Sequence, residues 1–332
     1  MPTPEGFSRR SALGLFGLGA GFGLAAGGSA RAQANWPDRP VRLIVPFGPG
    51  GAIDTLSRTV ANAFPAQANG QSLVVENRGG AGGTNAGAAV APAKPDGTTL
   101  MMADLGANAI GHEMARLTYD PAKAFTAVCH LVNLPLVLLV PADSPAKDVA
   151  GLVKLAKENP DLPYAHPGIG YAGHLAQELM IRRLGIRMTP VPYRSGAEVV
   201  RSLLSKETDS GFITVSTSLP FIREGKIRAL AVGSKRPVPQ LPGVPPLAET
   251  IPDFEAVVWH GIVAPAGLPP QITDAANRVF NAVLQQPEVR QTVEQTQAGE
   301  VVGGTPEEFA AFIRSQTERW VPVIRAAGIK AE

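Results

Sequence analysis

The sequence predicts an α/β protein whose strands are mainly parallel. Strand-like apolar segments alternate along the chain with segments in which apolar residues recur at helical spacing. Two of the strand-like segments run directly into glycine-rich loops, and a helical pattern begins after each loop. At 332 residues, the chain is also long enough to form two lobes with separate cores.

The first hundred residues contain three expected strands, at 41–45, 73–76 and 98–103. The first is a short apolar run that ends at a glycine-rich loop. A helix is expected over 52–64, because its apolar residues follow the 3.6-residue period. A small-residue helix ending at 90 is expected after the flexible loop 79–83.

The alternation continues through the rest of the chain. Asp148 stands where the N-cap of a helix is expected. Pro190 and Pro192 indicate an edge strand, because proline cannot donate to a strand ladder. The proline-rich stretch 237–252 is expected to be irregular. The expected strands are 136–140, 162–165, 188–192, 211–215, 228–232 and 257–264, and the expected helices are 149–158, 174–184, 197–204, 270–284, 287–295 and 306–327.

The N-terminal residues have the pattern of an export signal. Arg9 and Arg10 precede the apolar, glycine-rich run 11–29, and a small-residue cleavage site follows in either of two overlapping frames. The many glycines disfavour the alternative of a membrane anchor. Ser8 and the arginine pair fit a twin-arginine signal, and a general secretory signal stays open. We therefore expect an export signal over 1–34 and a mature protein in the periplasm.

Charge and cysteine content argue against a nucleic-acid partner and against an intrachain disulfide. Without Arg9, Arg10, Arg31 and Glu5, the 30 basic and 28 acidic side chains become equal in number, so the mature chain is formally neutral. That balance gives no support for a nucleic-acid partner. The single cysteine, Cys129, cannot form an intrachain disulfide, and its apolar surroundings predict a buried thiol.

Two glycine-rich loops are the strongest functional signal. Loop 46–51 follows the strand 41–45, and loop 166–173 leads into the helix 174–184. Loops of this kind leave main-chain N–H groups unpaired at a helix N-terminus, where they can bind an anion. Because neither loop carries a catalytic side chain, the pattern predicts a protein that holds a carboxylate between two lobes.

The second loop also permits a different function. Gly168, Gly170 and Gly173 match the G-x-G-x-x-G pattern of a dinucleotide site, and Arg194 could meet a 2′-phosphate. The alternative is therefore an exported Rossmann-type NAD(P)-dependent oxidoreductase. The loop lies deep in the chain, however, and the next strand is proline-marked as an edge. We therefore expect no cofactor and no enzymatic activity.

Other catalytic and metal-binding patterns are missing from the sequence. It contains neither a G-x-S-x-G elbow nor an H-E-x-x-H motif, and its histidines lack metal-ligand spacing. His174 and Glu178 lie one helical turn apart and predict either a structural hydrogen bond or a ligand contact. Asp54 could brace the start of its helix or accept a hydrogen bond from a ligand amine. No metal site is expected.

Several short motifs, taken together and in order, resemble the substrate-binding proteins of tripartite tricarboxylate transporters, the Bug family. The resemblance covers nearly all of the mature chain. It implies a two-lobed periplasmic binding protein of the type II-like class, with a carboxylate held in a cleft between the lobes. It also implies delivery to membrane transporter subunits without catalysis; a role in signalling rather than uptake stays open. The motifs are Pro46-Phe47-Gly48-Pro49-Gly50-Gly51-Ala52-Ile53-Asp54, Val75-Glu76-Asn77-Arg78 with Gly80-Ala81-Gly82-Gly83, Pro95-Asp96-Gly97-Thr98-Thr99-Leu100, Tyr119-Asp120-Pro121, Gly168 and Gly170 with His174, Leu175 and Glu178, Val191-Pro192-Tyr193, Leu241-Pro242-Gly243-Val244-Pro245, and Trp259-His260-Gly261 with Ala264-Pro265.

The loops and the resemblance lead to a set of expected lobes and ligand-binding residues. Lobe 1 is expected over 35–138 and 256–332, lobe 2 over 139–255, and the protein is expected to be a monomer. The chain departs from the family pattern at His166 and Tyr171, where small hydroxyl residues are usual, so these bulkier side chains could narrow the cleft or contact a ring. The expected ligand-binding residues are Phe47, Gly48, Pro49, Gly50, Gly51, Asp54, Asn85, Asp104, His166, Gly168, Gly170, Tyr171, Ala172, His174 and Ser216.

Overall fold

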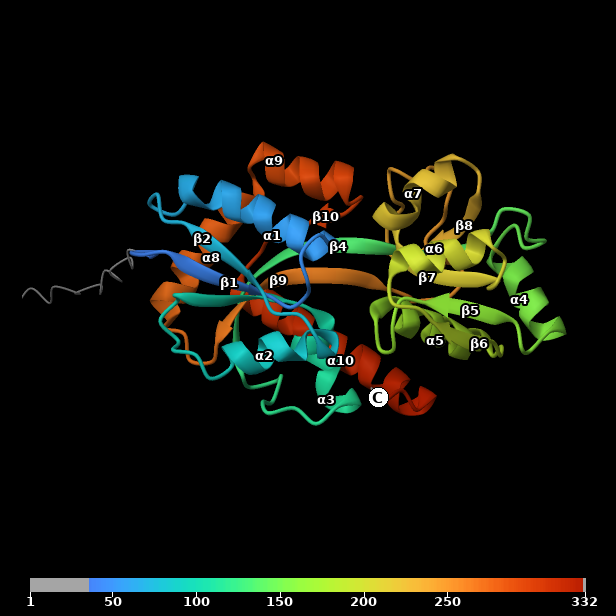
Figure 1. The fold of residues 1–332 in the computed structure, drawn as a ribbon, viewed down its shortest axis with the longest axis horizontal. Coiled ribbons are helices and arrows are strands. Elements are labelled where there is room, and N and C mark those ends of the chain that lie inside the picture. Colours follow the sequence, from blue (N-terminus) through green and yellow to red (C-terminus); the bar gives the residue numbers. More distant parts are fainter. Residues whose placement is uncertain (1–35, 331–332) are drawn as a thin grey trace, which may run out of the picture. The chain divides into compact units, whose positions relative to one another are not determined.

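The computed structural model describes residues 36–330, which lie within one compact unit (Figure 1). The export signal expected over 1–34 lies outside the described residues. Within the described range, no helix combines the length and the apolar character needed to cross a bilayer.

The strands form one continuous hydrogen-bonded system with the order β2-β1-β3-β9-β4-β7-β5-β6, and β8 and β10 pair with β4. Parallel pairs join β1 to β2 and β3, and β5 to β6 and β7. The pairs made by β4 and β9 are antiparallel, so the expectation of mainly parallel sheets is wrong at the centre. The strands are β1 (Val41–Val45), β2 (Leu73–Asn77), β3 (Thr99–Ala103), β4 (Phe125–Pro141), β5 (Pro163–His166), β6 (Thr189–Pro192), β7 (Ser210–Thr214), β8 (Ile227–Val232), β9 (Val257–Pro265) and β10 (Glu300–Val301).

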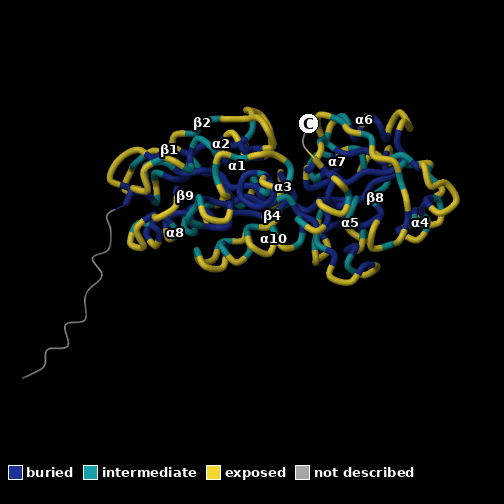
Figure 2. The backbone as a smooth tube through the Cα atoms, turned by 90° about the horizontal axis from the view of Figure 1, so that it is seen from below, coloured by how far each residue is buried: buried dark blue, intermediate teal, exposed yellow. Residues whose placement is uncertain are grey.

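Strand β4 is much longer than the sequence predicts. It has 17 residues and is buried over most of its length (Figure 2). Its first part pairs with β9 as far as Pro135, and from Leu136 onward it pairs with β7 and β8. We call the strands β1, β2, β3, β9 and β10 with the first part of β4 sheet A, and β5 to β8 with the rest of β4 sheet B. Pro135 interrupts the apolar pattern, but β4 continues through it because β9 pairs with the residues before it and β7 and β8 pair with the residues after it.

Most helices lie where the periodicity places them, and the α/β class is confirmed. The Asp148 carboxylate caps α4 as predicted, accepting a hydrogen bond from the Gly151 N–H at 2.7 Å. The helices are α1 (Ala52–Ala63), α2 (Thr84–Val90), α3 (Gly111–Met114), α4 (Val149–Glu158), α5 (Ala172–Leu184), α6 (Gly196–Leu204), α7 (Val215–Arg223), α8 (Pro270–Leu284), α9 (Pro287–Arg290) and α10 (Pro306–Ala327), with 3₁₀ turns η1 (Phe64–Ala66), η2 (Ala81–Gly83) and η4 (Leu247–Glu249) and π-helical turns η3 (Gly106–Ile110) and η5 (Gln291–Thr296).

Two helical regions were not predicted from the sequence. The segment that forms η3 and α3 is rich in small residues, so it shows no apolar face. Helix α7 begins with hydroxyl residues and contains Pro220, a residue that normally interrupts helices. Strand β6, by contrast, lies at the end of the strand order, so the edge position predicted from its prolines is confirmed.

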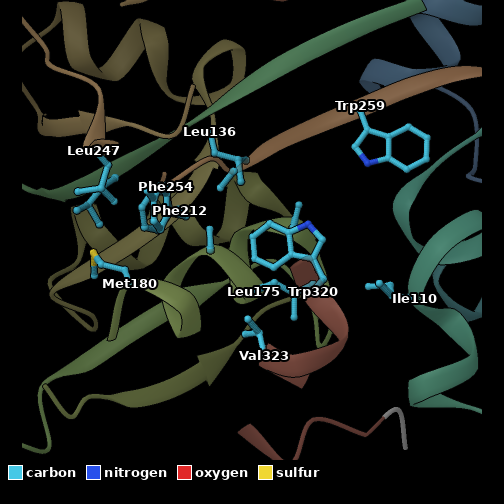
Figure 3. Close-up of a cluster of buried hydrophobic side chains, with 14 of the residues drawn as sticks. Ile110, Leu136, Leu175, Met180, Phe212, Leu247, Phe254, Trp259, Trp320 and Val323 are labelled. Carbon is cyan, nitrogen blue, oxygen red and sulfur yellow. The ribbon is translucent and has the colours of Figure 1, made fainter. Parts of the chain in front are cut away.

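The C-terminal helix α10 shares one hydrophobic core with elements of both sheets. Trp320 and Val323 of α10 lie in the same buried cluster as Leu175 of α5 and Phe212 of β7 (Figure 3). The rings of Phe212 and Phe254 stack in this core with 6.1 Å between their centroids. A second buried cluster lies between sheet A and helices α1 and α8. This packing fixes the ends of β1, β3, β5 and β9, where the candidate site is found.

Candidate functional site

The loop between β1 and α1 is held in shape by Asp54. Its Oδ2 accepts hydrogen bonds from the Gly50 N–H at 2.9 Å and from Nε of Arg58 at 3.0 Å. Its Oδ1 accepts from Nδ2 of Asn77 at 2.9 Å, and the same Nδ2 donates to the Phe47 carbonyl. The Arg58 guanidinium and these N–H donors lower the pKa of Asp54 to about 2. Asp54 therefore braces the loop, as the first of its two predicted roles requires.

The loop between β5 and α5 rests on two histidines. Nδ1 of His166 lies 2.9 Å from the Gly168 carbonyl oxygen, and the Gly170 N–H donates to Nδ1 of His174 at 3.1 Å. The two imidazole rings stack with 3.9 Å between centroids and 10° between planes. Because Nδ1 of His174 accepts a hydrogen bond, the hydrogen-bond pattern assigns the proton of this ring to Nε2.

Burial keeps this histidine pair neutral. It lowers the pKa of His174 to about 3, with a further contribution from the nearby His166, and it also lowers the pKa of His166. Glu178 does not pair with His174 but accepts a hydrogen bond from the Tyr164 hydroxyl. Both residues therefore make structural hydrogen bonds, and the stacked rings form an uncharged support for the loop.

The two loops meet beside a pocket. The rings of Phe47 and Tyr171 contact each other edge to face, with centroids 6.2 Å apart. Next to them lies a pocket with an empty volume of about 500 Å³, which we call the loop pocket. Its lining comes from both loops and from β9, η2, η3 and α3: Phe47, Gly82, Asp104, Leu105, Gly106, Met114, Ile169, Gly170, Tyr171, Ala172, Val258, Trp259 and His260.

Asp104 places an acidic group in this lining directly after β3. Its side chain is buried, and its carboxyl oxygens accept hydrogen bonds from the N–H groups of Gly106 at 3.1 Å and Ala107 at 3.2 Å. Burial outweighs these two bonds and raises the pKa of Asp104 to about 7. A carboxyl group that keeps its proton near neutral pH can donate a hydrogen bond to the oxygen of an anion.

Trp259 of β9 adds a second donor to the lining. The indole is 1% exposed, and its Nε1 has no hydrogen-bond partner among residues 36–330. A buried N–H without a partner is costly, so such a group commonly marks the position of a ligand or an ordered water. The neighbouring His260 is also buried, which lowers its pKa to about 4.

The structure brings together part of the expected ligand-binding set. Phe47, Asp104, Gly170, Tyr171 and Ala172 line the loop pocket. Gly48, Pro49, Gly50 and Gly51 form the exposed loop beside Phe47, Gly168 belongs to the loop above the histidines, and His166 and His174 lie buried beneath it. Asn85 donates to the Gly79 carbonyl, and Ser216 bonds to Thr214 at the start of α7; neither lines the pocket, and their roles stay predictions.

The sequence did not point to Trp259 or Met114 as lining residues. Trp259 stood out only within a motif of the resemblance, and an unpaired indole N–H becomes visible only once the neighbouring strands are placed. Met114 lies in α3, which has no sequence signal. The main-chain N–H of Gly170, one of those a pyrophosphate could use in a dinucleotide site, already donates to His174. In the described part of the chain, no cluster of three or more histidine, cysteine or acidic residues could hold a metal ion.

Comparison with known proteins places this site in a family. The family model described as the tripartite tricarboxylate transporter family receptor, TctC, matches residues 56–329. The chain is 32% identical to the protein BugT of Bordetella pertussis, over 93% of this chain and 96% of that protein. The structure of Rpa4515 of R. palustris with adipate has a TM-score of 0.77 and 32% identity, covering 89% of this chain and 99% of that one. The structure of MatC from Rhodopseudomonas palustris with bound malate has a TM-score of 0.74 and 30% identity, covering 87% and 100%. The chain therefore belongs to the receptor family of the tripartite tricarboxylate transporters, which includes the Bug proteins.

Proposed function

We propose that this protein captures a small organic carboxylate in the loop pocket, in the periplasm, and delivers it to the membrane subunits of a tripartite tricarboxylate-type transporter. The observation that carries the proposal is the convergence of hydrogen-bond donors on one pocket. The N-terminus of α5 opens onto the lining at Ala172, and a helix N-terminus favours an anion. Asp104 in its protonated form and the indole N–H of Trp259 add side-chain donors.

The chemistry of the pocket favours a dicarboxylate. One carboxylate fits the end lined by Ile169–Ala172, where α5 begins. The other end of the ligand then faces Asp104, Trp259 and the loop after β1 that carries Phe47. The relatives with adipate and malate in their structures support this class, since both ligands are dicarboxylates.

The lobes expected from the sequence remain part of the proposal. Residues 35–138 and 256–332 would form one lobe and residues 139–255 the other. The change of partners of β4 between Pro135 and Leu136 supports this division, because sheet A ends and sheet B begins there. Each lobe would then contribute one of the two loops at the pocket.

A calorimetric screen tests the proposal. We expect the purified protein to bind at least one dicarboxylate more tightly than the matching monocarboxylate, with micromolar affinity, which corresponds to about 8 kcal/mol. The bound acid should be recovered unchanged, as judged by NMR of the released ligand. Chemical conversion of the acid would contradict a binding function, and the lack of binding to any mono-, di- or tricarboxylate would contradict the ligand class.

The pKa of Asp104 predicts how affinity depends on pH. The bound carboxylate needs the protonated form of Asp104 as its donor, so the dissociation constant should rise up to about tenfold per pH unit above pH 7. Calorimetry between pH 6 and pH 9 measures this slope. Asp104→Asn cannot lose a proton and should bind with a flat profile. The control Asp143→Asn alters an exposed carboxylate paired with Lys206, and should keep the wild-type slope. A wild-type slope in Asp104→Asn would show that another group titrates.

A further inference from the structure

We propose that the protein has a second small-molecule site, which takes an uncharged carbonyl compound with a hydrocarbon body. The site is a cavity with an empty volume of about 780 Å³ between α10, the start of β4 and η3, and we call it the helix pocket. It shares no lining residue with the loop pocket. The residues that carry the proposal are Asn108, Phe125, Ala127, Ile313, Arg314 and Glu318.

The walls of the helix pocket are mostly hydrocarbon. Phe125 and Ala127 of β4 and Ile313 of α10 are only half-buried, so they present apolar surface that a ligand could cover. The Phe125 ring is held in place by Tyr119, whose ring lies edge-on with its centroid 5.5 Å away. Removing such apolar surface from water favours binding of a hydrocarbon body.

One polar group in the wall is left without a partner. Asn108 is 2% exposed, and its Nδ2 finds no hydrogen-bond acceptor in the described part of the chain. Its Oδ1 accepts from the Asp104 N–H at 3.0 Å, which fixes the orientation of the amide. The unsatisfied atom is therefore a donor, and the group that would satisfy it is an acceptor such as a carbonyl oxygen.

The mouth of the helix pocket favours a ligand without net charge. Arg314 and Glu318 are both exposed and lie one turn apart on α10, so the opposite charges at the rim balance. Because the donor inside is a neutral amide, nothing in the interior compensates the desolvation of a carboxylate. An amide, ketone or lactone has a carbonyl acceptor and no net charge, whereas the organic acids proposed for the loop pocket are charged.

The test is an NMR titration of the full protein with cyclohexanone, with cyclohexanecarboxylate as the charged analogue. An excess of a dicarboxylate found in the calorimetric screen occupies the loop pocket. We expect cyclohexanone to cause saturable shifts of the amide signals of Asn108, Ala127 and Ile313, and no change at Gly170 and Tyr171. The carboxylate analogue should bind at least tenfold more weakly.

Two substitutions make the result specific. Asn108→Leu keeps the approximate size of the side chain but removes the donor, together with the acceptor of the Asp104 N–H, and should weaken cyclohexanone binding at least tenfold. Ala310→Phe fills the pocket from the half-buried face of α10 and should abolish the shifts while dicarboxylate binding in the loop pocket persists. The proposal is overturned if cyclohexanone gives no saturable shifts at these amides, if the carboxylate analogue binds equally well, or if Ala310→Phe binds like the wild type. Because binding in the loop pocket is measured separately, failure here leaves the proposed transport function untouched.

Discussion

Gly48→Val is expected to weaken carboxylate binding at least a hundredfold and to leave the protein folded. A Cβ atom at Gly48 would meet nothing within 4 Å, and its φ angle is not in the left-handed region, so the loop can keep its conformation. The branched side chain would then block the approach of an anion to the main-chain N–H groups beside Phe47. Loss of two hydrogen bonds to a charged group, each worth about 1.5–3 kcal/mol, corresponds to a hundredfold or more.

Calorimetry and thermal unfolding together decide the outcome for Gly48→Val. The matched control is Gly196→Ala at the start of α6, where a Cβ atom would make an ordinary contact of 3.4 Å with Thr217. Both variants should unfold near the wild-type temperature, and only Gly48→Val should lose affinity. Gly170 is a poorer choice, since its φ is +71° and a Cβ atom there would lie 2.1 Å from Sδ of Met114. Wild-type affinity in Gly48→Val would place the carboxylate away from this loop.

The free energy of unfolding is expected to fall steeply as the pH drops below about 6.5. Burial lowers the pKa of four histidines: to about 4 for His130 and His260, to about 3 for His174, and by a smaller amount for His166. In the unfolded chain these rings take up protons near pH 6.5, whereas in the folded protein they stay neutral. A lowered pKa contributes stability that is present above pH 6.5 and is lost as the pH falls towards the folded value.

The effect of Asp104 on the free energy of unfolding has the opposite sign and is smaller than that of the four histidines together. Its pKa is raised to about 7 in the fold, so its contribution is present below the unfolded value near 3.8 and is lost as the pH rises through 7. The four histidines therefore outweigh Asp104 between pH 4 and pH 6.5. Each unit of pKa shift corresponds to about 1.4 kcal/mol, so the net loss between pH 7 and pH 5 should be on the order of 5 kcal/mol.

Urea unfolding at a series of pH values measures this dependence. In His174→Asn, the amide oxygen can accept the Gly170 hydrogen bond in place of Nδ1, but the side chain cannot titrate. This variant should show a shallower slope of unfolding free energy against pH than the wild type. A flat profile in the wild-type protein between pH 7 and pH 5 would mean that the buried histidines take up protons without unfolding.

The sequence predicts those parts of the fold in which a periodic apolar pattern is bounded by residues that start or end a helix. Helices α4, α8 and α10 begin and end as expected, because an apolar period is bounded by caps or prolines. The full length of β4 was not predictable, since its continuation through Pro135 depends on pairing with β9. For the site, the glycine loops identified Phe47 and Tyr171 as candidates. The position of Trp259 in the paired strand β9 and the burial of Asp104 depend on tertiary packing, which no local pattern encodes.

The position of Trp259 gives this protein a built-in optical reporter. The chain has three tryptophans: Trp36 packs against Phe64, Trp320 of α10 lies in the buried core, and Trp259 lines the loop pocket. Indole emission responds to the polarity and hydrogen bonding around Nε1, which in Trp259 lacks a partner. A ligand arriving at this group changes the emission of one ring and leaves the environments of the other two unaltered. The tryptophan fluorescence of the unlabelled protein therefore reports whether the loop pocket is occupied.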